Sequence, residues 1–204
     1  MREGAHALTG PHDCPLLRVL REGYITRDGE SIVDASSSVV LVESAGLRVI
    51  VDTGSREGRG GLIEALESNG VGCSEVDMVV NTHLHADHCG CNDLFPGARF
   101  FAHRLESPEA HFIRPEDGTV LAPGVTVMET PGHTLGSISV LVEADRRHAV
   151  AGDALPTKAN HESHIPPGIN VDRRLAMASM DRLVSWAEII VPGHDSPFEI
   201  IGKK

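Results

Sequence analysis

Four separate apolar runs in this chain each end in a side chain that can bind a metal ion. The segments VVNTH, VMETPGH, AVAGD and EIIVPGH end at His83, His133, Asp153 and His194. Short apolar runs bounded by turn residues predict buried strands. In layered folds with parallel strands, ligand-binding side chains lie on the loops at the carboxyl ends of the strands. We therefore predict that these four side chains meet at one edge of a sheet.

Length and composition favour one layered domain. The chain has 204 residues, of which 41% are hydrophobic and only 3% aromatic. This is enough chain for one well-buried core and too little for two ordinary domains. Branched aliphatic side chains must form that core, as they do in buried strands. The prediction is a single α/β or α+β domain over residues 1–204, with about residues 1–14 ragged.

The pattern of apolar and turn residues predicts most of the individual elements. A hairpin is predicted over residues 39–51 with its turn at 44–46. One helix is predicted over 61–69, ending before Gly70, and another after Asp172 as N-cap. The further predicted strands are 76–80, 100–102, 125–128, 138–142, 149–151 and 189–191. Residues 154–171 are predicted to be a long loop that serves as a lid or substrate-binding segment.

Charge and hydropathy limit the expected surroundings and partners. The beginning of the chain lacks the apolar stretch of a signal peptide, and no 18 consecutive apolar residues occur, so a cytoplasmic protein without a membrane span is expected. The formal net charge of −11 disfavours a nucleic acid as partner. A small-molecule substrate is the expected partner, and a homodimer is left open.

Residues 82–88 concentrate side chains that bind metal ions. These side chains are His83, His85, Asp87 and His88. Imidazole and carboxylate are typical ligands of zinc, with iron or manganese as alternatives, whereas calcium and magnesium prefer oxygen ligands throughout. Together with His133, Asp153 and His194 the set is too large for one tetrahedral zinc ion. The count predicts two divalent metal ions, zinc in the first place, with the Asp153 carboxylate between them.

These motifs resemble the ligand set of the metallo-β-lactamase superfamily, in particular its small single-domain branch. The matching segments are HLHADH, TPGHTLGS, AGD and VPGHDSPF. The resemblance implies a four-layer αβ/βα sandwich. It also implies one metal ion held by His83, His85 and His133, a second held by Asp87, His88 and His194, and a bridging Asp153.

The resemblance implies a metal-dependent hydrolase that is not a true β-lactamase. Many lactam hydrolases carry Cys where this chain has Asp153, and the single tyrosine, Tyr24, lies far from the position expected of the active-site Tyr of acyl-homoserine lactonases. Our leading hypothesis is hydrolysis of a small ester, thioester or lactone by a metal-bridging hydroxide. Asp87 would be the catalytic residue that ligates one metal ion and holds that hydroxide.

Three other functions are open at this point. The same two-metal site would serve a phosphodiesterase or ribonuclease, although the net charge speaks against a nucleic acid substrate. A mononuclear iron persulfide dioxygenase would use fewer ligands than this chain offers. A non-catalytic metal-binding protein would place its metal in a closed site rather than on open strand ends.

Several residues outside the ligand set are candidates for supporting roles. Asp52 ends a strand and is predicted to hydrogen-bond a ligand histidine and so fix its tautomer. His103 also ends a strand and is assigned a second-sphere or structural role. The remaining candidates are His161 and His164 as substrate-binding residues, for which ordinary exposed histidines are the alternative, and Cys89 and Cys91 as ligands, for which small buried thiols are the alternative.

Overall fold

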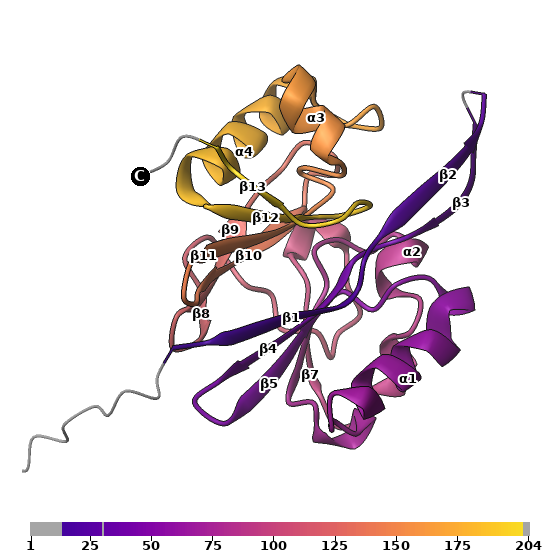
Figure 1. Cartoon of the computed structure of the whole chain (residues 1–204), viewed down its shortest axis with the longest axis vertical. Helices are drawn as coiled ribbons and strands as arrows, with labels where there is room; N and C mark the ends of the chain where they lie inside the picture. Colours follow the sequence, from indigo (N-terminus) through magenta and orange to yellow (C-terminus); the bar gives the residue numbers. More distant parts are fainter. Residues whose placement is uncertain (1–13, 30, 202–204) are drawn as a thin grey trace, which may run out of the picture.

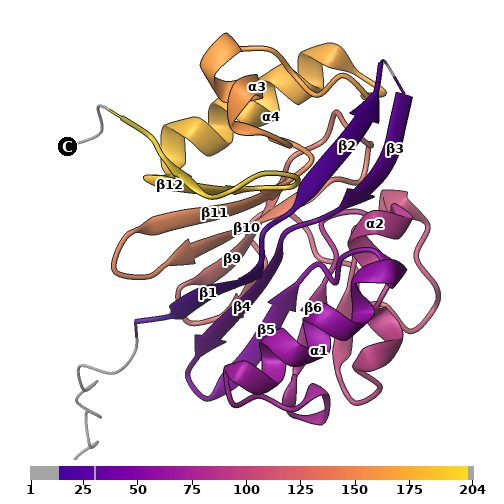
Figure 2. The same cartoon turned by 45° about the vertical axis from the view of Figure 1, so that its right-hand side comes forward.

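The computed structural model describes residues 14–29 and 31–201. Two mixed β-sheets face each other, and helices cover the outer side of each sheet (Figure 1). Figure 2 shows the resulting four layers of helix, sheet, sheet and helix. This is the αβ/βα sandwich that the resemblance implies. In the described part of the chain, every helix is too short or too polar to cross a membrane.

The first sheet comes from the N-terminal half of the chain, in the strand order β1-β4-β5-β6-β7. Its strands are β1 (Leu16–Arg21), β4 (Val39–Ser44), β5 (Leu47–Val51), β6 (Met78–Val80) and β7 (Arg99–Phe101). Strands β1, β4 and β5 pair antiparallel, whereas β5, β6 and β7 pair in parallel. The carboxyl ends of β5, β6 and β7 therefore lie at one edge of the sheet.

The second sheet comes from the C-terminal half, in the strand order β13-β12-β11-β10-β9-β8. Its strands are β8 (Val120–Ala122), β9 (Val125–Glu129), β10 (Ile138–Glu143), β11 (Arg147–Gly152), β12 (Ile189–Pro192) and β13 (Phe198–Glu199). Only β11 and β12 pair in parallel among these strands. The segment that connects β11 to β12 contains the helices α3 (Lys158–Ser163) and α4 (Arg173–Trp186).

Short helices connect the strands of the first sheet. Helix α1 (Arg59–Ser68) precedes β6, and the single-turn helix α2 (Ala86–Cys89) follows it. The 3-10 turns are η1 (Arg56–Gly58), η2 (Cys73–Glu75), η3 (Asn92–Leu94) and η4 (Arg104–Glu106). A separate hairpin of β2 (Tyr24–Asp28) and β3 (Ser31–Ser36) projects from the body of the molecule (Figure 2).

Apolar side chains fill three layers of core, and the alternation along a strand decides which layer each side chain enters. Val40 and Val42 of β4 lie between the sheets with Val140 of β10, whereas Leu41 of the same strand faces α1. On the far side, Leu183 of α4 packs on the outer face of the second sheet. Both faces of the central strands are covered, which explains the unbroken apolar runs at residues 39–42, 49–51 and 149–151.

Most elements predicted from the pattern are present with shifted ends. The predicted helix at 61–69 is α1 over Arg59–Ser68, and Asp172 is the N-cap of α4, where its carboxylate accepts hydrogen bonds from the backbone of Arg174 and Leu175. The prediction of a loop throughout 154–171 is wrong, because Lys158–Ser163 forms helix α3. Thr157 caps this helix by accepting a hydrogen bond from the backbone N–H of Asn160, a signal that the sequence carries.

Candidate metal centre

The seven predicted ligands lie where strands of both sheets end at the same edge. His83 follows β6, while His85, Asp87 and His88 belong to the start and body of α2. From the second sheet, the ligands His133, Asp153 and His194 follow β9, β11 and β12. The structure thus brings together side chains that are up to about a hundred residues apart, and His88 and His194 are one such pair.

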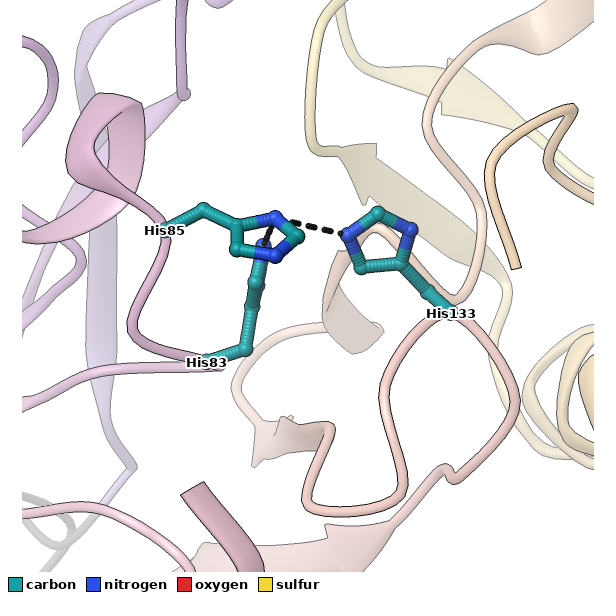
Figure 3. Close-up of side chains that lie close together, drawn as sticks. All are labelled: His83, His85 and His133. Carbon is teal, nitrogen blue, oxygen red and sulfur yellow. Dashed lines mark hydrogen bonds between the residues drawn. The ribbon is translucent and has the colours of Figure 1, made fainter. Parts of the chain in front are cut away.

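The rings of His83, His85 and His133 form the first group (Figure 3). Nε2 of His83 lies 3.0 Å from Nδ1 of His85, which lies 3.1 Å from Nε2 of His133. His83 and His133 are buried, whereas His85 is open to the cleft. Three nitrogen atoms that point at one another in this way can hold a divalent ion in common.

Asp87, His88 and His194 form the second group. Nε2 of His194 lies 3.4 Å from Nε2 of His88 and 3.5 Å from Oδ2 of Asp87. Ligand atoms within each of these groups lie within 4.8 Å of one another, as they also do in a third group made of His83, His88 and Asp153. The three groups overlap, so the cluster is continuous.

Asp153 lies between the two groups. Its Oδ1 is 3.4 Å from Nε2 of His88 and 3.3 Å from Nε2 of His194, and its Oδ2 is 3.6 Å from Nε2 of His133. Gly193 makes room for this carboxylate, because a Cβ at that position would lie 2.2 Å from Oδ1. Oδ1 is buried and has no hydrogen-bond partner among the described residues. A buried carboxylate oxygen without a donor is costly unless a cation satisfies it, so the residues fit a bound metal ion.

Burial and neighbouring charges shift the pKa values of several side chains in the cluster. Burial lowers the pKa of His83 well below the usual histidine value, and His88 lowers it further, so this ring is neutral and able to ligate. Burial opposes protonation of His88, but the carboxylates of Asp52 and Asp153 outweigh it and raise the pKa of His88 well above its usual value. Burial also opposes ionisation of Asp153, yet His88 and His194 hold its pKa well below the usual range.

Asp52 supports the cluster from the end of β5. Its Oδ2 lies 2.8 Å from Nδ1 of His88 and accepts a hydrogen bond from Oγ1 of Thr82 at 2.7 Å. Its Oδ1 accepts a hydrogen bond from the backbone N–H of Thr82, also at 2.7 Å. The structure therefore contains a contact between Asp52 and His88, one of the predicted ligands.

Backbone carbonyl groups orient two further rings. Nδ1 of His133 donates to the carbonyl of Ile169 at 2.8 Å. Nδ1 of His194 is shared between the carbonyls of Tyr24 at 3.1 Å and Ser36 at 3.0 Å, which are paired residues at the base of the β2–β3 hairpin. Because Nδ1 carries the proton in each ring, Nε2 presents its lone pair to the cluster.

A cleft of about 410 Å³ opens above the cluster. The β2–β3 hairpin supplies one wall with Ile25, Ile32 and Val33, and the segment around Ile169 supplies the opposite wall. Arg27 and Asp34 of the hairpin also line the cleft, and so do His85, Asp87, His133, Asp153 and His194. The cleft therefore combines apolar walls with a polar floor, as small-molecule sites do.

Other histidines predicted near the site lie elsewhere. The buried His103 accepts a hydrogen bond from the backbone N–H of Leu105 and so caps η4, which is a structural role. His161 belongs to α3, where its ring stacks on Phe198 at 5.5 Å between centroids. His164 ends that helix and pairs with Asp181 at 2.9 Å on the surface. None of these three rings lines the cleft of the metal cluster.

The two cysteines after the motif contact backbone carbonyls. Sγ of Cys89 lies 3.6 Å from the carbonyl of Leu84, and burial raises the pKa of this thiol to about 11. Sγ of the buried Cys91 lies 3.2 Å from the carbonyl of Ser55. Within the described residues, neither thiol belongs to a group that could hold a metal ion. Small, partly or fully buried thiols are therefore the interpretation that the structure favours.

Sequence reasoning missed two features of the site. The β2–β3 hairpin is one, although Asp28-Gly29 between the apolar residues Ile25 and Ile32 is a common hairpin signal. Glu106 is the other, since it contacts the backbone of the ligand segment at Leu84 from a distance of 22 residues along the chain. No local pattern marks a contact of this kind.

Comparison with known proteins agrees with this geometry. The family model of the metallo-beta-lactamase superfamily matches residues 32–123. A protein of Methanocaldococcus jannaschii, named as a probable metallo-hydrolase, is 34% identical in an alignment of 184 positions that covers 88% of this chain and 87% of that protein. Metallo-beta-lactamase domain-containing protein 1 of Mus musculus is 34% identical in an alignment of 194 positions that covers 90% of this chain and 74% of that protein.

A solved structure of similar fold extends the agreement to the second sheet. A metallo-beta-lactamase-like protein of Thermotoga maritima superposes with a TM-score of 0.78 at 22% identity, covering 91% of this chain and 99% of that one. The family model ends before His133 and therefore does not cover His133, Asp153 and His194. In the folded chain these three side chains lie beside the motif at residues 83–88. Because it is 34% identical to both relatives and the matches cover 88% and 90% of its own length, this chain belongs to the metallo-beta-lactamase superfamily.

Proposed function

We propose that the protein is a dinuclear metal-dependent hydrolase of small esters, thioesters or lactones. The observation that carries this proposal is the overlap of three ligand groups at the floor of one cleft, with Asp153 between the two outer groups. His83, His85 and His133 would hold one ion, Asp87, His88 and His194 the other, and Asp153 would contact both. Zinc is the ion that this mixture of imidazole and carboxylate favours.

The bound ions would supply an activated water at neutral pH and an electrophilic site for the carbonyl oxygen of the substrate. The side chains of the cluster prepare this chemistry before the substrate arrives. Asp52, Ile169 and the base of the hairpin hold the rings of His88, His133 and His194 in one tautomer. Fixed rings need no reorganisation during the reaction, which lowers its barrier.

Asp87 is the carboxylate that we assign to the attacking water. Its Oδ2 lies 3.5 Å from Nε2 of His194, and its side chain retains 28% exposure. The Asp153 side chain, by contrast, is 11% exposed. Asp87 would accept a hydrogen bond from the attacking water and so orient it toward the substrate.

The walls of the cleft favour a small substrate with an apolar part. Ile25, Ile32 and Val33 face the cleft from the hairpin, and Ile169 faces it from the opposite wall. An apolar acyl group that packs against these side chains would bring its carbonyl carbon to the histidine floor. A substrate of this shape fits a cleft of about 410 Å³.

The test combines metal content with hydrolysis. Purified protein is analysed for metal per chain and assayed with a carboxyl ester, a thioester, a lactone and bis-nitrophenyl phosphate, before and after chelation. We expect two zinc ions per chain and turnover of a carboxyl substrate that chelation abolishes and added zinc restores. Cleavage of the phosphate alone would replace the proposed substrate class, and one iron per chain without hydrolysis would overturn the proposal.

The Asp87 role has its own test. Asp87→Ala should lose turnover by at least about 100-fold, a loss comparable to that of a key transition-state hydrogen bond. Metal analysis of the variant separates the effect of a lost ligand from the effect of a lost proton acceptor. Full turnover of Asp87→Ala with both metal ions bound would contradict the role.

A further inference from the structure

The first group of ligands is assembled from two sheets that share no short connection. His83 and His85 follow β6 of the first sheet, whereas His133 follows β9 of the second. Figure 3 shows the three rings meeting across the gap between their two chain segments. Some contact outside the rings must hold these segments at the separation that a common metal ion needs.

One carboxylate contacts both segments. Oε2 of Glu106 accepts a hydrogen bond from the backbone N–H of Leu84 at 3.0 Å. Oε1 accepts a hydrogen bond from Oγ1 of Thr134 at 2.5 Å. Leu84 stands between His83 and His85, and Thr134 directly follows His133. Glu106 thereby connects the backbone next to all three rings.

The surroundings of Glu106 are built to keep it there. The ring of His103 caps η4 and so fixes the turn on which Glu106 lies. Gly136 lies against the carboxylate, where a Cβ would approach Oε1 to 2.6 Å and the backbone nitrogen of Glu106 to 2.8 Å. Any larger residue at position 136 would displace the carboxylate or the loop.

The Thr134 side of the contact is also held in place. Oγ of Ser137 accepts a hydrogen bond from the backbone N–H of Thr134 at 3.1 Å and lies 2.8 Å from its hydroxyl oxygen. The hydroxyl of Thr134 is therefore enclosed between Glu106 and Ser137. Its position relative to His133 cannot change without breaking one of these hydrogen bonds.

Glu106 is not itself a ligand. It belongs to none of the groups in the described residues whose atoms could share an ion. Both of its oxygens already accept hydrogen bonds, and it does not line the cleft above the cluster. Its effect on the metal centre must act through the two segments that it joins.

We infer that Glu106 is a positioning residue, which sets the separation of the His83–His85 segment from the His133 loop and thereby the affinity of the first metal site. The inference rests on the proposed dinuclear centre. The second group is held by other contacts, namely Asp52 on His88 and the carbonyls of Tyr24 and Ser36 on His194. Loss of Glu106 should therefore weaken one of the two metal sites and spare the other.

The experiment measures zinc affinity rather than turnover. Metal-free protein is titrated with zinc in competition with a chromogenic chelator, and the melting temperature of the metal-free protein is recorded alongside. In Glu106→Ala we expect one zinc site to weaken about 10- to 100-fold, as is typical when a contact behind a metal ligand is lost. The second site and the melting temperature of the metal-free protein should stay close to the wild-type values.

Two variants and a control make the result specific. Glu106→Gln should recover most of the affinity, because the glutamine side chain can form both hydrogen bonds. Its carbonyl oxygen can accept a hydrogen bond from the backbone N–H of Leu84, and its amide group can donate one to Oγ1 of Thr134. The hydroxyl of Thr134 would then donate its own hydrogen bond to Ser137. Thr134→Val removes only one of the two hydrogen bonds, keeps the size of the side chain, and should give an intermediate loss. Glu109→Ala is the matched control, since Glu109 is 83% exposed on the same segment and should leave both sites unchanged.

Three outcomes would overturn the inference: unchanged affinity in both Glu106→Ala and Thr134→Val, equal weakening of both sites, or a loss in Glu106→Gln as large as in Glu106→Ala. If Glu106→Ala does not fold, Thr134→Val and Glu106→Gln decide the question. The wild type tells the two proposals apart. If the wild type binds two zinc ions but does not hydrolyse any substrate, only the hydrolase proposal is overturned. If the wild type binds two zinc ions and is active, but the variants bind zinc with unaltered affinity, only the role of Glu106 is overturned.

Discussion

Oδ2 of Asp52 lies 2.8 Å from Nδ1 of His88, and both side chains are buried. The carboxylate accepts a hydrogen bond from Nδ1–H of this ring, which leaves Nε2 of His88 facing His194 and Asp153. Asp52 has a positive φ of 55°, a conformation that Asp and Asn adopt more readily than other side chains. The end of β5 thus places an acidic residue where both its backbone geometry and its charge are required.

Asp52→Asn keeps the shape of this side chain and its tolerance of positive φ, but it replaces one acceptor oxygen with a donor. The variant can no longer accept three hydrogen bonds at once, namely those from Nδ1 of His88 and from the backbone N–H and the hydroxyl of Thr82. We expect about 10- to 100-fold weaker binding of one zinc ion, measured by chelator competition. The affected site should differ from the one weakened by Glu106→Ala, and loss of the same site in both variants would contradict the division into two groups.

Val33 lines the cleft from β3 and is 60% exposed. Val33→Ser removes apolar surface from the wall that would contact the acyl group of a substrate. We expect KM for a longer acyl ester to rise about fourfold, the equivalent of one methylene group, while kcat and the KM for an acetyl ester remain unchanged. Val120→Ser is the control, because Val120 is 68% exposed but lies on β8 outside the cleft. An equal rise of KM for both esters would indicate that Val33 does not contact the acyl chain.

Glu43 accepts hydrogen bonds from Arg18 and Arg48, which lower its pKa below the usual 4.5. A lowered pKa in the folded state stabilises the fold above about pH 4.5, and this contribution disappears as the pH falls through the lowered value. We expect Glu43→Gln to lower the free energy of unfolding by about 0.5–1 kcal/mol at pH 7. Urea unfolding at a series of pH values should show the difference from wild type shrinking below about pH 4.5.

The matched control for this pH series is Glu67→Gln. Glu67 is exposed on α1, and in residues 14–29 and 31–201 its carboxylate forms no ion pair. Its replacement should change the unfolding free energy little at any pH. A difference between Glu43→Gln and wild type that stays constant from pH 7 into the acid range would show that the ion pairs are not its cause.

Leu183 of α4 is fully buried against the outer face of the second sheet. Leu183→Ala should lower the free energy of unfolding by about 2–5 kcal/mol, because the helix cannot collapse into the space left behind. Leu175→Ala on the same helix is the control, since Leu175 is 38% exposed and should cost much less. Both variants should bind zinc like the wild type below their melting temperatures, because neither residue lines the cleft or belongs to a ligand group.

Much of the fold is encoded in short-range patterns. Short apolar runs bounded by turn residues predict the strands β4, β5, β10, β11 and β12. Apolar residues at helical spacing, together with cap residues, predict the helices α1 and α4. The ligand types are equally local, since four of them lie within residues 83–88. Helix α3 was missed because its cap stands in a segment with few buried residues, so hydrophobic periodicity carried no signal there.

Patterns in the sequence, together with the family resemblance, predict the layered architecture, the chemical character of the cluster and the seven side chains that meet in it. The groups that support them became visible in the folded chain: Glu106, which accepts hydrogen bonds from Leu84 and Thr134, and the hairpin carbonyls that orient His194. Only the tertiary structure decided that His161 and His164 lie away from the cluster. The physical reason is that periodicity and capping depend on neighbours along the chain, whereas these contacts join residues from separate elements, whose distance is set only when the two sheets pack together.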